Sequence, residues 1–323
     1  MLHPLDILVL ALYLGLAVWI GVRVGRTAQG LEGYLLGSRS IPWWAILGSI
    51  VATETSTATF LSVPGISFAK EGDFGFLQLA VGYIVGRVLV VGLFLPAYFQ
   101  GKMLTAYQVL RSRYGPPVQK AASLLFLAAR NLGDGLRLFL AAVVLQQVLG
   151  VSVEWCVLLV GTVTIVYTLL GGIKSVVWND CIQFVIYIGG ALVALTLLAR
   201  QLPQGWSSIF TYAQAHDKFQ MWHWEFDWRQ PYTFWAGLVG GAFLTLGTHG
   251  TDQMMVQRLL GAGSLQGAAK ALLCSGVVVF LQFALFLFVG VALATFYHAF
   301  PPDRPFSTKD AVFSRFIVEE LPA

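Results

Sequence analysis

Long apolar stretches alternate with short polar connections along most of the chain. A helix needs about 20 mainly apolar residues to cross the hydrocarbon core of a bilayer, and this template predicts eight spans. Their expected bounds are 5–25, 42–67, 74–99, 120–148, 154–171, 178–199, 232–258 and 270–297. The tail that follows is too polar for a ninth span. The pattern therefore predicts an all-α polytopic membrane protein.

The composition favours a lipid bilayer as the main surroundings. Hydrophobic residues (AVILMFWYC) make up 57% of the 323 residues and charged residues only 11%, against about 25% charged residues in soluble domains. Lys and Arg never stand next to each other, so we expect no nucleic-acid partner. The three cysteines lie in apolar runs without metal-ligand spacing, and we expect them to be core residues.

The positions of Lys and Arg predict an N-terminus outside the cell, because basic residues concentrate in cytoplasmic loops. With this orientation the short outer loops receive only Lys70. The inner face receives ten basic residues: Arg23, Arg26, Arg39, Lys102, Arg111, Arg113, Lys120, Lys174, Arg258 and Lys270. We therefore expect a multi-pass protein of the plasma membrane.

Polar clusters interrupt two of the predicted spans. Six of the eight residues in Ala52–Thr59 carry a hydroxyl or carboxyl group, and Glu54 among them costs about 2.5–3.5 kcal/mol at the centre of a membrane helix. Gly247–Gln253 interrupts the seventh span in the same way. Two broken helices at corresponding places indicate a secondary-transporter site. A packing face of small residues is the alternative.

Charged residues also lie within the third and fourth spans. Arg130, Asp134 and Arg137 share one helix face. Two interpretations stay open for them: an ion-paired structural patch, or an arginine left free to bind an anionic solute through paired hydrogen bonds. We expect Arg87 to be structural and to pair with Glu54 or Asp252.

The outer loop contains the sequence MWHWEFDWRQ. Its three Trp residues predict an aromatic belt at the membrane interface, with an amphipathic helix on the outer surface. A lid over a ligand is the alternative. The polar residues within the spans form no acid–base pair around a nucleophile or a metal, so we expect neither an enzyme nor an organic cofactor.

Three stretches carry a resemblance to a known family: GGIKSVVWNDCIQ (Gly171–Gln183), LPAYFQGKMLTAYQVLRSRYG (Leu95–Gly115) and TDQMMVQRLLGAGS (Thr251–Ser264). The chain resembles the sodium:solute symporter family over essentially its whole length. The resemblance implies sodium-coupled solute uptake by a leucine-transporter-like core of two inverted five-helix repeats. Residues 1–323 would form one transporter domain: an extra N-terminal helix (1–30), the first repeat (42–199), an outer loop (200–231), two helices of the second repeat (232–297) and an outer tail (298–323).

The resemblance also implies where sodium and solute bind. Backbone carbonyl groups of Ala52 and Thr55 would hold sodium, with Asp180 at a second sodium region, and Glu54 and Asp252 are candidates for coupling. In the sialic acid symporter branch, the residues that match five positions of this chain contact the solute carboxylate and its surroundings. The seventh span adds two further candidates, Thr248 and His249. The expected solute-binding residues are Ser56, Thr59, Phe74, Gln78, Arg130, Thr248 and His249.

Sugar-transporting members have other residues where this chain has Glu54, Thr59, Thr248 and His249. The resemblance therefore implies an acidic organic solute, with a sugar or polyol symporter, or a transport-inactive solute sensor, as alternatives. The family core needs ten helices and only eight spans are predicted here. We expect the chain to be part of a longer transporter; the alternative is a degenerate product that does not transport alone.

Overall fold

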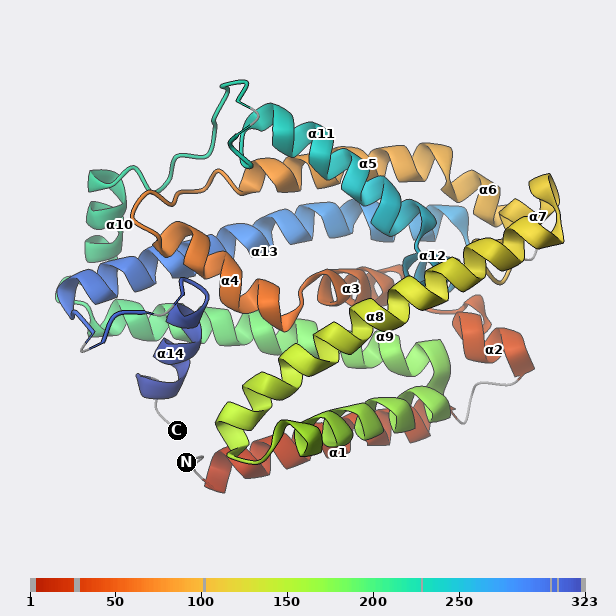
Figure 1. Ribbon diagram of the computed structural model, residues 1–323, viewed down its shortest axis with the longest axis horizontal. Coiled ribbons are helices and arrows are strands. Elements are labelled where there is room, and N and C mark those ends of the chain that lie inside the picture. The colour runs from red at the N-terminus through yellow and green to blue at the C-terminus, as the bar shows by residue number, and fades with distance from the viewer. Residues whose placement is uncertain are drawn as a thin grey trace.

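The computed structural model describes residues 4–25, 30–100, 103–227, 229–302, 304–306 and 308–320. Within these ranges the chain is helical and contains no strand. Long helices run side by side along the longest axis, and one further helix, α8, crosses them diagonally (Figure 1). The predicted all-α class is confirmed.

The helices begin and end close to the predicted spans. In chain order they are α1 (Pro4–Gly25), α2 (Gly30–Leu36), the 3₁₀ turn η1 (Gly37–Arg39), α3 (Trp43–Glu54), α4 (Thr57–Phe68), α5 (Leu77–Leu93), α6 (Leu95–Phe99), α7 (Gln108–Tyr114), α8 (Pro116–Leu149), α9 (Val153–Gln201), α10 (Trp206–Ala215), α11 (Phe234–Thr245), the π-helical turn η2 (Leu246–Thr251), α12 (Gln253–Leu260), α13 (Leu265–Ala299) and α14 (Ala311–Glu319).

Three of these helices, α1, α9 and α13, are long and apolar enough to cross a membrane by themselves. A fourth candidate is the pair formed by Gly30–Arg39 and α3, which is bent by 96°. The nine residues of α14 are too few to span a bilayer, in agreement with the prediction for the tail.

The fifth and sixth predicted spans form one long helix, α9, with a sharp break in it. Gly172 has φ +56° and ψ −152°, outside the helical region. A Cβ atom there would lie 2.5 Å from the carbonyl oxygen of Tyr34, so only glycine fits. The chain reverses direction at this point, and α1 packs against the first half of α9 (Figure 1).

The centre of the molecule is α13. Of its most apolar stretch, 61% is buried, against 17% for α1 and 22% for α9. Helices α3, α4 and α5 pack around α13, and Phe283, Phe286 and Phe313 belong to the largest buried cluster. The exposed leucines of α1 suit contact with lipid, because nothing within the described residues covers them.

The loop between α9 and α11 differs from the prediction at its Trp cluster. Its helix is α10, which precedes the cluster, whereas residues 220–227 are extended. Trp222 and Trp224 are partly exposed and stack on each other at 5.5 Å; Trp228 lies outside the described residues. The predicted amphipathic helix at the cluster is therefore wrong, because the backbone of this segment bonds to the start of α5 instead.

Candidate functional site

The first helix break separates α3 from α4. Thr55 (φ −92°, ψ 90°) and Ser56 (φ −77°, ψ 165°) are extended. The Ser56 hydroxyl then starts α4 by accepting a hydrogen bond from the backbone N–H of Thr59 at 3.3 Å. Since the last carbonyl groups of a helix have no helical partner, the end of α3 presents free backbone oxygen atoms at this point.

The second break lies between α11 and α12. The π-helical turn η2 occupies it, and Asp252 follows in an extended conformation. The Asp252 carboxylate caps α12 by accepting hydrogen bonds from the backbone N–H groups of Met254 and Met255, at 2.8 and 3.3 Å. Both breaks fall within the polar clusters that the sequence indicated.

A cavity of about 510 Å³ lies between the two breaks. Aromatic residues form part of its wall and charged residues another part. Its lining comprises Thr53, Glu54, Thr59, Ser62, Val63, Ile66, Phe76, Tyr83, Arg130, Arg137, Tyr232, Leu244, Thr245, Thr248, His249, Asp252, Met254, Met255 and Phe283.

Glu54 joins the two breaks through a buried ion network. One carboxylate oxygen accepts a hydrogen bond from Arg87 Nη2, and the other lies 3.2 Å from His249 Nε2. Arg87 is fully buried, and its Nε donates to Ser275 Oγ at 3.1 Å. The expected pairing of Arg87 with Glu54 is therefore confirmed.

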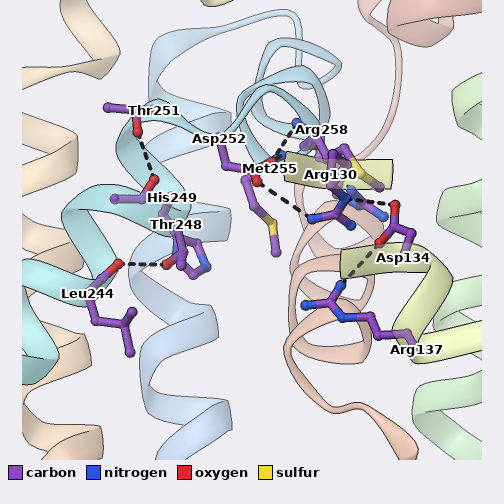
Figure 2. A network of polar contacts seen from close by, with 12 residues as sticks. Arg130, Asp134, Arg137, Leu244, Thr248, His249, Thr251, Asp252, Met255 and Arg258 are labelled. Atoms are coloured by element: carbon purple, nitrogen blue, oxygen red, sulfur yellow. Dashed lines mark hydrogen bonds and ion pairs between the residues drawn. The ribbon is translucent and has the colours of Figure 1, made fainter. Parts of the chain in front are cut away.

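A second set of charges joins α8 to the break before α12 (Figure 2). Arg130 contacts Asp134 at 2.8 Å and Asp252 at 3.6 Å, so it has two carboxylate partners rather than the single one expected. Within the part of the chain that the structure describes, Arg137 pairs with Asp134 alone, at 3.6 Å, and its side chain is 57% exposed. Arg137 is thus less neutralised than Arg130, and both line the cavity.

Asp180 lies in a third, more closed network. It accepts hydrogen bonds from the Ser49 hydroxyl and from Arg258 Nη2, the latter at 3.2 Å. Arg258 also donates to Ser49 Oγ at 2.8 Å. The assignment of Arg258 to the inner-face charges missed this role, since only 2% of the residue is exposed. A cation near Asp180 would compete with this guanidinium group.

Ala52 and Thr55 line another cavity, of about 480 Å³, which shares Thr53, Ser62 and Arg137 with the larger one. Ser56 and Gln183 also line it. The Thr55 hydroxyl accepts a hydrogen bond from Gln282 of α13. The predicted sodium residues are thus split: two lie at the free end of α3, and Asp180 lies in the Arg258 network.

The predicted solute residues are also divided. Thr59, Arg130, Thr248 and His249 line the larger cavity together. The other three do not line it: Ser56 caps α4, Phe74 packs on Phe219, and Gln78 bonds to backbone groups around it.

Sequence inspection missed the aromatic part of the cavity wall. The ring of Phe76 packs against the rings of Tyr232 and Phe283, with centroid distances of 5.3 and 5.2 Å. Aromatic residues are common in all spans of this chain, and their spacing carries no sign of which ones face a cavity. Among the described residues, no group of three or more His, Cys, Asp or Glu is placed to hold a metal ion.

Comparison with known proteins identifies the family. The family model described as "Sodium:solute symporter family" matches residues 34–318. The chain belongs to this family. The family is described as one of symporters, and the relatives named below are named as transporters.

Three relatives show the range of the family. The human sodium/iodide cotransporter is 30% identical over 90% of this chain. The sodium/sialic acid symporter SiaT of Proteus mirabilis (strain HI4320) is 27% identical over 96%, and human sodium-coupled monocarboxylate transporter 2 is 26% identical over 94%. The aligned regions cover 44%, 62% and 49% of these three relatives, so the chain spans less than two thirds of the length of each.

A solved structure shares the fold. It is the substrate-bound, outward-open state of a Na⁺-coupled sialic acid symporter, with a TM-score of 0.88 and 26% identity. The match covers 99% of this chain and 66% of that one.

Proposed function

We propose that the protein is a sodium-coupled symporter that imports a small organic solute carrying a carboxylate group. The observation that carries the proposal is the cavity of about 510 Å³ bounded by both helix breaks and by two arginines of α8. Free helix ends and exposed guanidinium groups are suited to binding an ion and an anion near the middle of a membrane. Relatives named for sialic acid and monocarboxylates support an acidic solute.

Arg137 is the stronger candidate for the carboxylate. Its guanidinium group lies 3.6 Å from Asp134, which is too far for a close hydrogen bond. Arg130, in contrast, is shared between two carboxylates. Thr59 and Thr248 line the same cavity. The double neutralisation of Arg130 also supports the alternative of a neutral sugar or polyol, which needs no unpaired positive charge.

Sodium would bind at the carboxyl end of α3. Thr55 N–H already bonds to Val51 O, so the carbonyl groups of Ala52 and the residues after it remain for a cation. Hard cations prefer such oxygen ligands, and the negative end of the helix dipole favours positive charge. Asp180 would join a sodium region only after Arg258 has moved away. The N-terminus outside the plasma membrane remains part of this proposal.

Uptake of labelled carboxylates into proteoliposomes, with and without an inward sodium gradient, tests the proposal. Arg137→Lys and Arg130→Lys keep the charge but lose the paired donors, and we expect carboxylate affinity to fall roughly ten- to hundredfold, more for Arg137→Lys. Arg111→Lys, on the exposed side of α7, is the matched control. Uptake of a neutral sugar that neither variant weakens would contradict the acidic-solute proposal.

A further inference from the structure

The Trp-containing part of the loop between α10 and α11 bonds to the end of α4 and to the start of α5. We name residues 216–227 the outer strap. Its side chains and backbone bond to the turn between α4 and α5, which comprises residues 69–76. The sequence alone left open whether this segment forms a lid.

Lys218 anchors the strap from within the protein. The residue is fully buried, and the three N–H donors of its Nζ share four backbone carbonyl groups within hydrogen-bond distance: Ala69, Gly72 at 2.9 Å, and Ser67 and Lys70 at 3.1 Å each. The carbonyls of Ser67 and Ala69 lie at the carboxyl end of α4, where the helix dipole favours a cation, and those of Lys70 and Gly72 lie in the turn that follows. Burial lowers the pKa of the Lys218 amino group, and nearby Asp73 opposes this shift.

Gln78 binds the strap at His223. Its side-chain oxygen accepts a hydrogen bond from the backbone N–H of His223 at 3.0 Å, and its Nε2 donates to Tyr232 O at 2.8 Å and to Gly75 O at 3.2 Å. The side chain is fully buried. Gln78 therefore connects the strap, the start of α5 and Tyr232 shortly before α11, and it has no donor left for a solute.

Tyr232 connects the Gln78 hydrogen bonds to the cavity wall. Its backbone is fixed by Gln78, while its ring packs edge-on against Phe76 at 5.3 Å and lines the cavity. Phe76 in turn contacts Phe283. These three residues form an apolar wall, whereas Arg130 and Arg137 of α8 bring charge to the same cavity.

We infer that Lys218 and Gln78 are positioning residues, which hold Tyr232 as part of an apolar wall that selects carboxylates with an apolar ring face. The inference rests on the proposed function for the carboxylate and adds the apolar half of the solute. It assigns Gln78 to the support of the cavity wall rather than to solute contact.

Competition between benzoate and acetate for uptake tests the selection, because the two differ in the ring that would meet the wall. We expect the wild type to prefer benzoate. We expect Tyr232→Ala, Gln78→Glu and Lys218→Met to reduce this preference roughly three- to tenfold, the usual contribution of one aromatic pair, and Tyr232→Phe to retain it. Lys70→Met is the control, since its side chain in the same turn is exposed. An unchanged preference in folded Lys218→Met and Gln78→Glu overturns the inference.

Hydrogen–deuterium exchange tests the strap without any solute. The backbone N–H groups of Phe74 and Phe234 bond to Gln220 O and His223 O, at 2.9 and 2.8 Å. In Lys218→Met, peptides covering these groups should exchange faster than in the wild type and in Lys70→Met. Unchanged exchange also overturns the inference. If the wild type transports neither carboxylate, the proposed function fails, and the exchange result then decides the role of the strap.

Discussion

Two buried arginines, Arg87 and Arg258, occupy similar networks with different surroundings. Each bonds to one carboxylate and one serine: Arg87 to Glu54 and Ser275, and Arg258 to Asp180 and Ser49. The Glu54 side faces the cavity and contacts His249. Neither Asp180 nor Arg258 lines a described cavity.

The difference indicates separate roles for similar chemistry. The Arg258 network ties α3, α9 and α12 together within the protein. The Arg87 network ties the two helix breaks together at the edge of a space that a solute can fill. We therefore expect the first to govern mainly stability and the second mainly transport.

Replacement of one of the two buried arginines provides the strongest test of this comparison. Arg258→Met leaves Asp180 buried without its counter-charge, and we expect about 3–5 kcal/mol of destabilisation. Chemical unfolding in detergent measures it. Arg258→Met combined with Asp180→Leu should recover most of the stability and retain solute binding. The matched pair, Arg87→Met with Glu54→Leu, should recover stability but lose transport. A double Arg258 variant that is as unstable as the single one would contradict the structural role.

The sodium dependence of uptake separates the two carboxylates further. Glu54→Gln removes a negative charge from the last residue of α3, next to the carbonyl groups proposed to hold sodium. We expect the sodium concentration for half-maximal uptake to rise roughly tenfold, or about 1.4 kcal/mol. Asp180→Asn should raise it less, because Arg258 already neutralises Asp180.

Exposed Glu154, changed to Gln, is the control for these measurements. Unchanged sodium dependence in both Glu54→Gln and Asp180→Asn would remove the two carboxylates from the sodium mechanism.

The helices and their breaks could be predicted from the sequence because bilayer thickness and backbone chemistry restrict them strongly. An apolar run of about 20 residues has few alternatives to a helix in lipid, and ATETSTAT does not suit a lipid-facing helix. The same reasoning placed the break before α12 at Gly247–Gln253, where η2 and Asp252 lie.

Partners across helices could not be predicted in the same way. Sequence spacing put Arg130 and Asp134 on one face, but the contact with Asp252 depends on how α8 crosses the other helices. Arg258 and Lys218 resembled ordinary loop charges, since neither stands in a long apolar run. Their burial follows from tertiary packing, which brings Asp180 to Arg258 and the end of α4 with the turn after it to Lys218.

The two serines give the smallest and most specific test of the comparison. Ser49 both donates to Asp180 and accepts from Arg258, whereas Ser275 accepts from Arg87 and donates to the backbone oxygen of Leu272. Hydrogen bonds to charged groups contribute about 1.5–3 kcal/mol and neutral ones about 1 kcal/mol. We therefore expect Ser49→Ala to destabilise the protein by about 1 kcal/mol more than Ser275→Ala in chemical unfolding. Equal losses would show that the Arg258 network is no more tightly bonded than the one beside the cavity.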